Sequence, residues 1–172
     1  NSDAYKLTVG NGGQFLMKSG KILIEVKVGG GGSYAEFEGG EIGSLNIIWG
    51  GTAGFSSGST IYSGKVTVYG GGEFIMAGGE TFGIDVDGGE IELIGGDVIS
   101  YGIEFLKGYG KIWGSTKINN INIYSKGLEI SGGDIGKLMI YSVGSVKINK
   151  YLGSTSIYSQ TGNPDMIIGP YK

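Results

Sequence analysis

The sequence repeats itself at a fixed interval, and this feature constrains the fold more than any other. The tripeptide Ile-Tyr-Ser begins at Ile123, Ile140 and Ile157, with the same spacing each time, and a further copy begins at Ile61. A regular period of this length, about 17 residues, is typical of a chain built from stacked, equivalent units. Residues one period apart are therefore predicted to lie side by side in ladders.

Glycine pairs recur on the same scale. Units of the form Gly-Gly-acid-apolar begin at Gly39, Gly71, Gly88, Gly95 and Gly132. The second and third units are again one period apart, and the blocks 39–47 (GGEIGSLNI) and 132–140 (GGDIGKLMI) agree almost residue for residue. Since glycine accepts the positive φ angles of sharp turns, the pairs are predicted to mark the corners of each repeat.

Between the glycines, apolar and polar residues alternate, as in Lys65–Tyr69, Glu90–Leu93 and Asn120–Ile123. This alternation, with β-branched and aromatic residues, is typical of β-strands. We therefore predict an all-β, single-stranded parallel β-helix, or β-solenoid, with about 17–19 residues and three short strands per coil. About nine coils would stack about 4.8 Å apart. The alternative is an antiparallel β-sandwich, which explains the alternation but not the recurrence of side-chain identity at a fixed period.

The whole chain, residues 1–172, is predicted to be one solenoid domain. Residues 1–13 either cap the N-terminal end or continue a longer solenoid. Residues 161–172 are predicted to cap the other end, because Pro164 and Pro170 cannot donate to a strand ladder.

The glycine-punctuated units, such as Gly72–Met76 and Gly89–Leu93, resemble the passenger repeats of self-associating autotransporter adhesins over residues 10–160. The resemblance lies in the period and the Gly-Gly punctuation. It implies a three-sided β-helix with an extracellular, adhesive role. The chain departs from that family because it is rich in Ile, Tyr, Lys and Glu rather than in Thr and Asn. Virion fibres use similar solenoids, so both a cell surface and a virion are predicted locations.

The composition removes several kinds of catalytic site. The chain has no His, no Cys and no Arg, which excludes Ser-His-Asp and Cys-His nucleophiles and most zinc sites. It also disfavours the pectin-degrading sites of other β-helices. Scattered lysines on an acidic chain disfavour nucleic-acid binding, and no apolar run approaches the ~20 residues of a membrane span. A non-catalytic structural or adhesive module is predicted.

An acidic group is the most site-like feature of the sequence: Asp85, Asp87, Glu90, Glu92 and Asp97. A coil of one sequence period would place Glu73 beneath Glu90 and Glu80 beneath Asp97. Because like charges on neighbouring strands repel, a bound Ca²⁺ would stabilise them; the alternative is that these carboxylates splay into solvent. No other cofactor is predicted. The first four would also be the carboxylates of a carbohydrate-binding or glycan-cleaving site, the second function considered.

Three tyrosines, Tyr124, Tyr141 and Tyr158, follow the inward isoleucines of the repeat and should point outward. At coil spacing they would form an aromatic stripe that binds a surface glycan or a protein partner. The alternative is that the ladder only stabilises the stack.

Charge also varies along the chain. Residues 33–104 hold eleven carboxylates against Lys65, whereas residues 105–172 hold eight lysines against three carboxylates. Because position in the sequence becomes position along a solenoid, the rod would be acidic in its middle and basic towards its C-terminal end. This pattern predicts a homo-oligomer, or a self-assembling filament, through charge attraction, or else a solvated surface that keeps the rod soluble.

Overall fold

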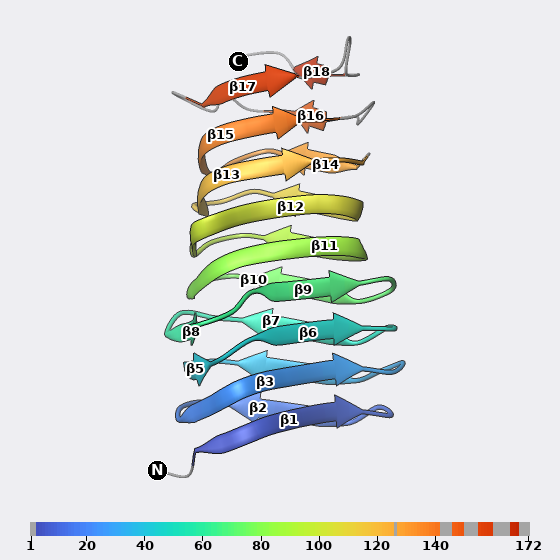
Figure 1. Cartoon of the computed structure of the whole chain (residues 1–172), viewed down its shortest axis with the longest axis vertical. Coiled ribbons are helices and arrows are strands. Elements are labelled where there is room, and N and C mark those ends of the chain that lie inside the picture. The colour runs from blue at the N-terminus through green and yellow to red at the C-terminus, as the bar shows by residue number, and fades with distance from the viewer. Residues whose placement is uncertain (1–2, 126, 142–145, 150–154, 160–165, 169–172) are drawn as a thin grey trace.

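The computed structural model describes residues 3–125, 127–141, 146–149, 155–159 and 166–168. In these residues there is no helix, and every strand pairing is parallel. The strands wind into a β-solenoid of about eight turns, with the coils stacked in order from the N-terminus upward (Figure 1). The predicted parallel β-solenoid is therefore confirmed, and the antiparallel sandwich is wrong.

Three ladders of strands form three sides of the column, here named sides A, B and C. Side A contains β1 (Ala4–Gly10), β3 (Lys21–Gly29), β6 (Leu45–Ile48), β9 (Val66–Tyr69), β11 (Glu80–Leu93), β12 (Asp97–Ile112), β13 (Lys117–Ile123), β15 (Asp134–Ile140) and β17 (Ser156–Ser159). Side B contains β2 (Gln14–Met17), β4 (Tyr34–Phe37), β7 (Thr52–Phe55), β10 (Glu73–Met76), the ends of β11 and β12, β14 (Leu128–Ile130), β16 (Val146–Ile148) and β18 (Met166–Ile168). Side C is narrow and contains β5 (Gly40–Ile42), β8 (Ser59–Ile61) and the beginnings of β3, β11, β12, β13 and β15.

One column of side A shows how long each coil is. It contains Leu7, Val26, Leu45, Val66, Ile84, Ile103, Ile121, Leu138 and Ile157, each paired with the next. The step from Ile121 to Leu138 is the shortest, and the step from Leu45 to Val66 is the longest. The longest step exceeds the predicted coil length, while the others lie within the predicted range. The coils are thus less uniform than predicted, because the turns between strands differ in length.

The glycine pairs mark two corners rather than one. The pairs at 39–40, 95–96 and 132–133 lie where side B turns into side C, and those at 71–72 and 88–89 lie where side A turns into side B. At both corners one glycine of the pair has a positive φ, such as 93° at Gly96 and 94° at Gly88. The similar blocks 39–47 and 132–140 both run from the B–C corner through side C to side A. Their similar sequences thus occupy equivalent parts of two coils.

The interior is filled by side chains that compensate one another in size. On side B one inward column contains Phe15, Ala35, Ala53 and Phe74, and the next contains Met17, Phe37, Phe55 and Met76. Each of these coils therefore combines Phe with Met or Ala with Phe. The four rings contact one another in turn, with centroids 6.0, 5.1 and 5.5 Å apart. These rings belong to a continuous core, in which most inward residues are fully buried.

The first described residues form ordinary strands of the solenoid. β1 pairs with β3 on side A, and β2 pairs with β4 on side B. Residues 4–10 therefore lie in the side A ladder. Most of the predicted C-terminal cap, residues 161–172, lies outside the described residues, and within it β18 pairs with β16. The described part of the chain has no helix that could cross a membrane.

Candidate binding surfaces

The predicted tyrosine stripe is a stacked pair in the structure. The rings of Tyr124 and Tyr141 lie 4.6 Å apart and are nearly parallel, with an interplanar angle of 5°. Tyr158 instead pairs with Met139, and Lys137 Nζ lies 5.0 Å from the centre of its ring. The reason is the length of the coil. The step from Leu138 to its partner Ile157 is longer by two positions than the step below it, so the third tyrosine is displaced by the same amount.

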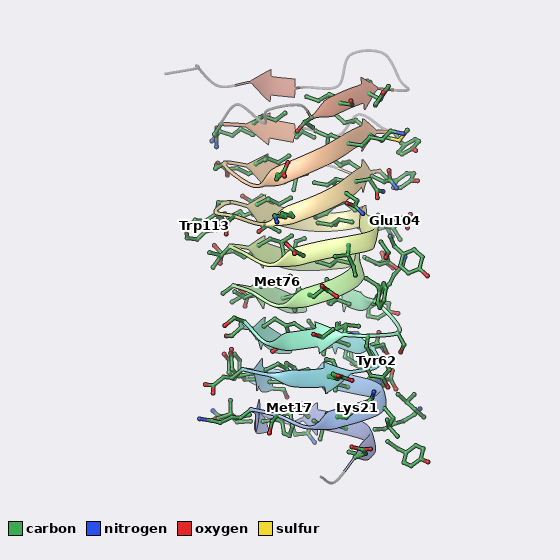
Figure 2. The ribbon with its side chains drawn as sticks, turned by 90° about the vertical axis from the view of Figure 1, so that its left-hand side faces the viewer. Met17, Lys21, Tyr62, Met76, Glu104 and Trp113 are labelled. Carbon is green, nitrogen blue, oxygen red and sulfur yellow. The ribbon has the colours of Figure 1, made fainter. Side chains whose placement is uncertain are left out.

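The upstream Ile-Tyr-Ser copy belongs to another part of the solenoid. Tyr62 follows a side C strand, and its hydroxyl donates a hydrogen bond of 2.6 Å to the Leu23 carbonyl. Lys21 Nζ lies 4.0 Å from the centre of the Tyr62 ring, and the two lie together in Figure 2. This tyrosine therefore stabilises a corner and does not extend the pair at Tyr124 and Tyr141.

Further apolar side chains lie at the corner between sides A and B, and we call this set the aromatic edge: Trp49, Tyr69, Leu106, Tyr124 and Tyr141. Trp49 is 75 % exposed, and Tyr69, Leu106 and Tyr124 are each 41–43 % exposed. Backbone contacts place Leu106, Tyr124 and Tyr141 at equivalent points of successive coils, since Tyr124 N donates to Phe105 O and Tyr141 N donates to Ile123 O. Trp49 lies one position further into its turn than Tyr69 does, because Ile47 pairs with Val68 and Trp49 N donates to Gly70 O. Partial burial, with the neighbouring Tyr141 and Glu104, raises the pKa of Tyr124. The repeat of the sequence does not reveal Trp49, Tyr69 and Leu106, because none of them stands in a copy of Ile-Tyr-Ser.

The five predicted metal ligands are not brought together. Asp85 and Asp87 lie on side A, Glu90 and Glu92 lie on side B, and Asp97 lies on side C. Within the described residues no group of three or more such ligands is placed to hold a metal ion. The chain turns a corner at Gly88, so Asp87 and Glu90, although close in the sequence, lie on different sides of the column.

The register predicted for the acidic residues is confirmed: Glu73 pairs with Glu90, and Glu80 pairs with Asp97. Other carboxylates pair with lysines of neighbouring coils. Lys65 Nζ lies 2.9 and 3.2 Å from the two carboxylate oxygens of Asp85. Lys21 and Glu41 are 2.9 Å apart, and this hydrogen bond raises the pKa of Lys21. Such contacts hold adjacent coils in register.

Side B carries an open groove beside Trp113, which projects from one side of the column while Glu104 lies on the opposite side (Figure 2). β12 directs Tyr109 and Lys111 outward at alternate positions, and Trp113, the residue that follows β12, continues the alternation. The groove has a volume of about 400 Å³ and is lined by Glu92, Lys111, Ile112, Trp113, Glu129 and Ser131. A smaller hollow of about 80 Å³ shares Glu92 and Lys111 and continues towards Tyr109, Glu73 and Glu90. The alternation of Lys111, Ile112 and Trp113 was the signal that could have found this surface.

Hydrogen bonds fix the side chains around this groove. Trp113 Nε1 donates to Glu92 Oε1 at 3.0 Å. Glu129 Oε1 accepts from Lys147 Nζ at 3.2 Å and from Asn149 Nδ2 at 2.7 Å, while Tyr109 OH donates to Glu129 Oε2 at 3.3 Å. The Lys147 and Asn149 contacts lower the pKa of Glu129, and partial burial, followed by the charge of Glu129, raises the pKa of Tyr109. The carboxylate is therefore ionised and the phenol protonated at neutral pH.

No protein-family model, curated protein or solved structure matches this chain. The functional proposals below therefore rest on the sequence and on the two surfaces just described. The resemblance to autotransporter passenger repeats stays a prediction from the sequence.

Proposed function

We propose that this chain is a non-catalytic structural and adhesive module of an extracellular surface, either a cell envelope or a virion fibre, and that the aromatic edge is its contact surface. The observation that carries the proposal is the conformation of Trp49. Its φ is +44°, a left-handed angle that a bulky residue rarely adopts, and its side chain is 75 % exposed. In the coil below, the equivalent residue is Gly30, with φ of +89°.

Strained backbone at an exposed aromatic residue supports a role outside the fold. A left-handed conformation costs a non-glycine residue about 1–2 kcal/mol. The exposed Trp49 ring recovers little of this energy by burial, whereas a glycine would fit the turn without strain. Strain of this kind is found where a side chain serves binding, and exposed apolar residues that gather in one region of the surface mark interaction sites.

The positions of the carboxylates support a non-catalytic role. The glycan-cleaving alternative would use Asp85, Asp87, Glu90 and Glu92, and these lie on two different sides of the A–B corner. Asp85 is moreover paired with Lys65. Glycoside hydrolysis needs two carboxylates that converge on one bond.

Self-association is the second candidate, and the order of the coils supports it. The coils follow the sequence along the axis (Figure 1), so the acidic residues 33–104 occupy the middle of the column. The described lysines that follow, from Lys107 to Lys147, lie above them. An acidic middle would attract the basic end of a second copy, and salt would weaken this attraction.

Adhesion can be tested with beads that carry the chain at high density, on surfaces coated with mucin, with denatured collagen or with the chain itself. We expect the Trp49→Gly variant to adhere several-fold less than the wild type. Its free energy of unfolding should be unchanged or higher by about 1 kcal/mol, because the left-handed strain is removed. Tyr101→Ser is the matched control, since Tyr101 is 59 % exposed but lies on the corner between sides C and A.

Equal adhesion of the Trp49→Gly variant and the wild type would contradict the proposed contact surface. An equal loss of adhesion in the Tyr101→Ser control would contradict it as well. Light scattering measures the molar mass of the soluble chain at low and high salt and so tests self-association independently of adhesion. A filament held by charge attraction should give larger species at low salt. A monomer at both salt concentrations would contradict self-association.

A further inference from the structure

We infer that the groove between Trp113 and Tyr109 on side B is a binding site for an uncharged oligosaccharide. The site is separate from the aromatic edge, which lies at the corner between sides A and B. It therefore goes beyond the proposed adhesive contact, and either surface could fail its test without the other.

Trp113 provides a fixed aromatic platform. Its indole N–H is held by Glu92 Oε1 at 3.0 Å, and the side chain remains 43 % exposed. Backbone contacts place Ser131, a small residue, at the equivalent point of the coil above, since Trp113 N bonds Leu93 O and Ser131 N bonds Ile112 O. The negative face of an aromatic ring attracts polarised C–H groups, which line the faces of sugar rings.

Polar groups around the platform match the hydroxyls of a sugar. Within the described residues Lys111 forms no ion pair, and its Nζ lies 5.8 Å from the centre of the Tyr109 ring. Ser131 Oγ accepts a 3.0 Å hydrogen bond from Asn149, so its hydrogen is left to donate. Glu92 accepts the Trp113 hydrogen bond through one oxygen and presents a second. A few convergent polar groups beside an apolar surface are typical of ligand sites.

The size of the groove indicates more than one sugar ring. Its volume of about 400 Å³ lies in the roughly 300–1,000 Å³ range of small-ligand sites. Tyr109 lies on β12 and Trp113 directly follows it, so the two are four residues apart, about 13 Å at 3.3 Å per residue. The smaller hollow towards Tyr109 shares Lys111 with the main groove, so a chain of sugars would contact both aromatic rings.

Charge decides which class of oligosaccharide the groove accepts. Four carboxylates lie on or beside it, those of Glu73, Glu90, Glu92 and Glu129. Lys111 and Lys147 are the lysines near them, and Lys147 is paired with Glu129. This excess of negative charge repels uronate and sulfated glycans and leaves hydroxyl-rich, uncharged sugars as the ligand.

The two tryptophans of the chain allow a direct test. In a Trp49→Phe background, all tryptophan fluorescence comes from Trp113. The probes are tetrasaccharides of glucose, mannose and N-acetylglucosamine, with tetragalacturonate as the charged counterpart. We expect at least one neutral tetrasaccharide to change the emission in a saturable way, and tetragalacturonate to bind at least about tenfold more weakly.

Variants of the wild-type chain, measured by calorimetry with the same neutral tetrasaccharide, complete the test. Trp113→Ala should weaken binding at least about tenfold, as expected for an aromatic anchor, and Lys111→Met should weaken it several-fold. Tyr101→Ala is the matched control and should bind as the wild type does, because Tyr101 is an exposed aromatic residue at the corner between sides C and A. Circular dichroism checks that each variant is folded. The inference is overturned if no neutral tetrasaccharide changes the emission, if binding survives Trp113→Ala, or if tetragalacturonate binds more tightly than the neutral sugars.

Discussion

The fit between Gly110 and Phe105 allows a quantitative test of how the core is packed. Gly110 lies in an inward column of side B, paired with Ile91 and Leu128. Phe105 points inward from side A and is 1 % exposed. A Cβ atom added at Gly110 would lie 2.4 Å from Phe105 Cζ and 2.7 Å from Cε1. The phenyl ring thus fills the space that a side chain on side B fills in other coils.

The Gly110→Ala substitution should therefore overpack the core. One extra carbon in a closely packed interior typically costs about 1–3 kcal/mol, and the backbone conformation adds no strain, because the φ of Gly110 is not positive. Alanine also stiffens the unfolded chain, which raises stability by roughly 0.4–1 kcal/mol. Gly31→Ala measures this second effect by itself, since nothing lies within 4 Å of a Cβ at that exposed position.

Urea unfolding of the two variants gives the comparison. We expect Gly110→Ala to be less stable than Gly31→Ala by about 1–3 kcal/mol, or roughly 2–12 °C in Tm. Phe105→Leu removes the two ring atoms that the new Cβ would meet. The double variant Phe105→Leu/Gly110→Ala should therefore be more stable than the sum of the single effects predicts, with a coupling of about 0.5–3 kcal/mol. Equal stability of the two alanine variants, or strict additivity in the cycle, would refute the reasoning.

Two further predictions concern side B. Phe55→Ala removes the ring between Phe37 and Phe74, at 5.1 and 5.5 Å, and should lower the free energy of unfolding by about 3–5 kcal/mol; a loss below about 1 kcal/mol in urea unfolding would contradict the ring stack. The Tyr34 hydroxyl donates a hydrogen bond to Glu36, which raises the pKa of Tyr34 from 10.0 to about 12. The folded state thus favours the protonated phenol, so the stability it contributes is complete below pH 10 and is lost as the pH rises towards 12. Tyr34→Phe should reduce the loss of stability in this window, and an ordinary tyrosine pKa in an ultraviolet titration of the wild type would count against the contact.

The sequence by itself determined the type of fold. Alternation in segments such as Glu90–Leu93 specified strands, glycine pairs specified corners, and a recurring period specified stacking. These signals are local, because each depends on a few neighbouring residues or on one repeat length. The same signals correctly placed Glu73 beside Glu90, since the coil between them has the length of the sequence period.

Only the tertiary structure decided which residues lie on the same side of the column and which of them stack on one another in successive coils. The register of each coil depends on the length of every turn, and the unequal steps along the side A column displace side chains that a uniform period would align. The step from Leu138 to Ile157 is two residues longer than the step before it, so Tyr158 does not stack on Tyr141. The corner at Gly88 separates Asp87 from Glu90. Trp113 and its neighbours, Glu92 below and Ser131 above, come from three successive coils. Because the fold decides which residues pair in the ladder and which remain in each turn, the composition of the two candidate surfaces is a property of the folded column.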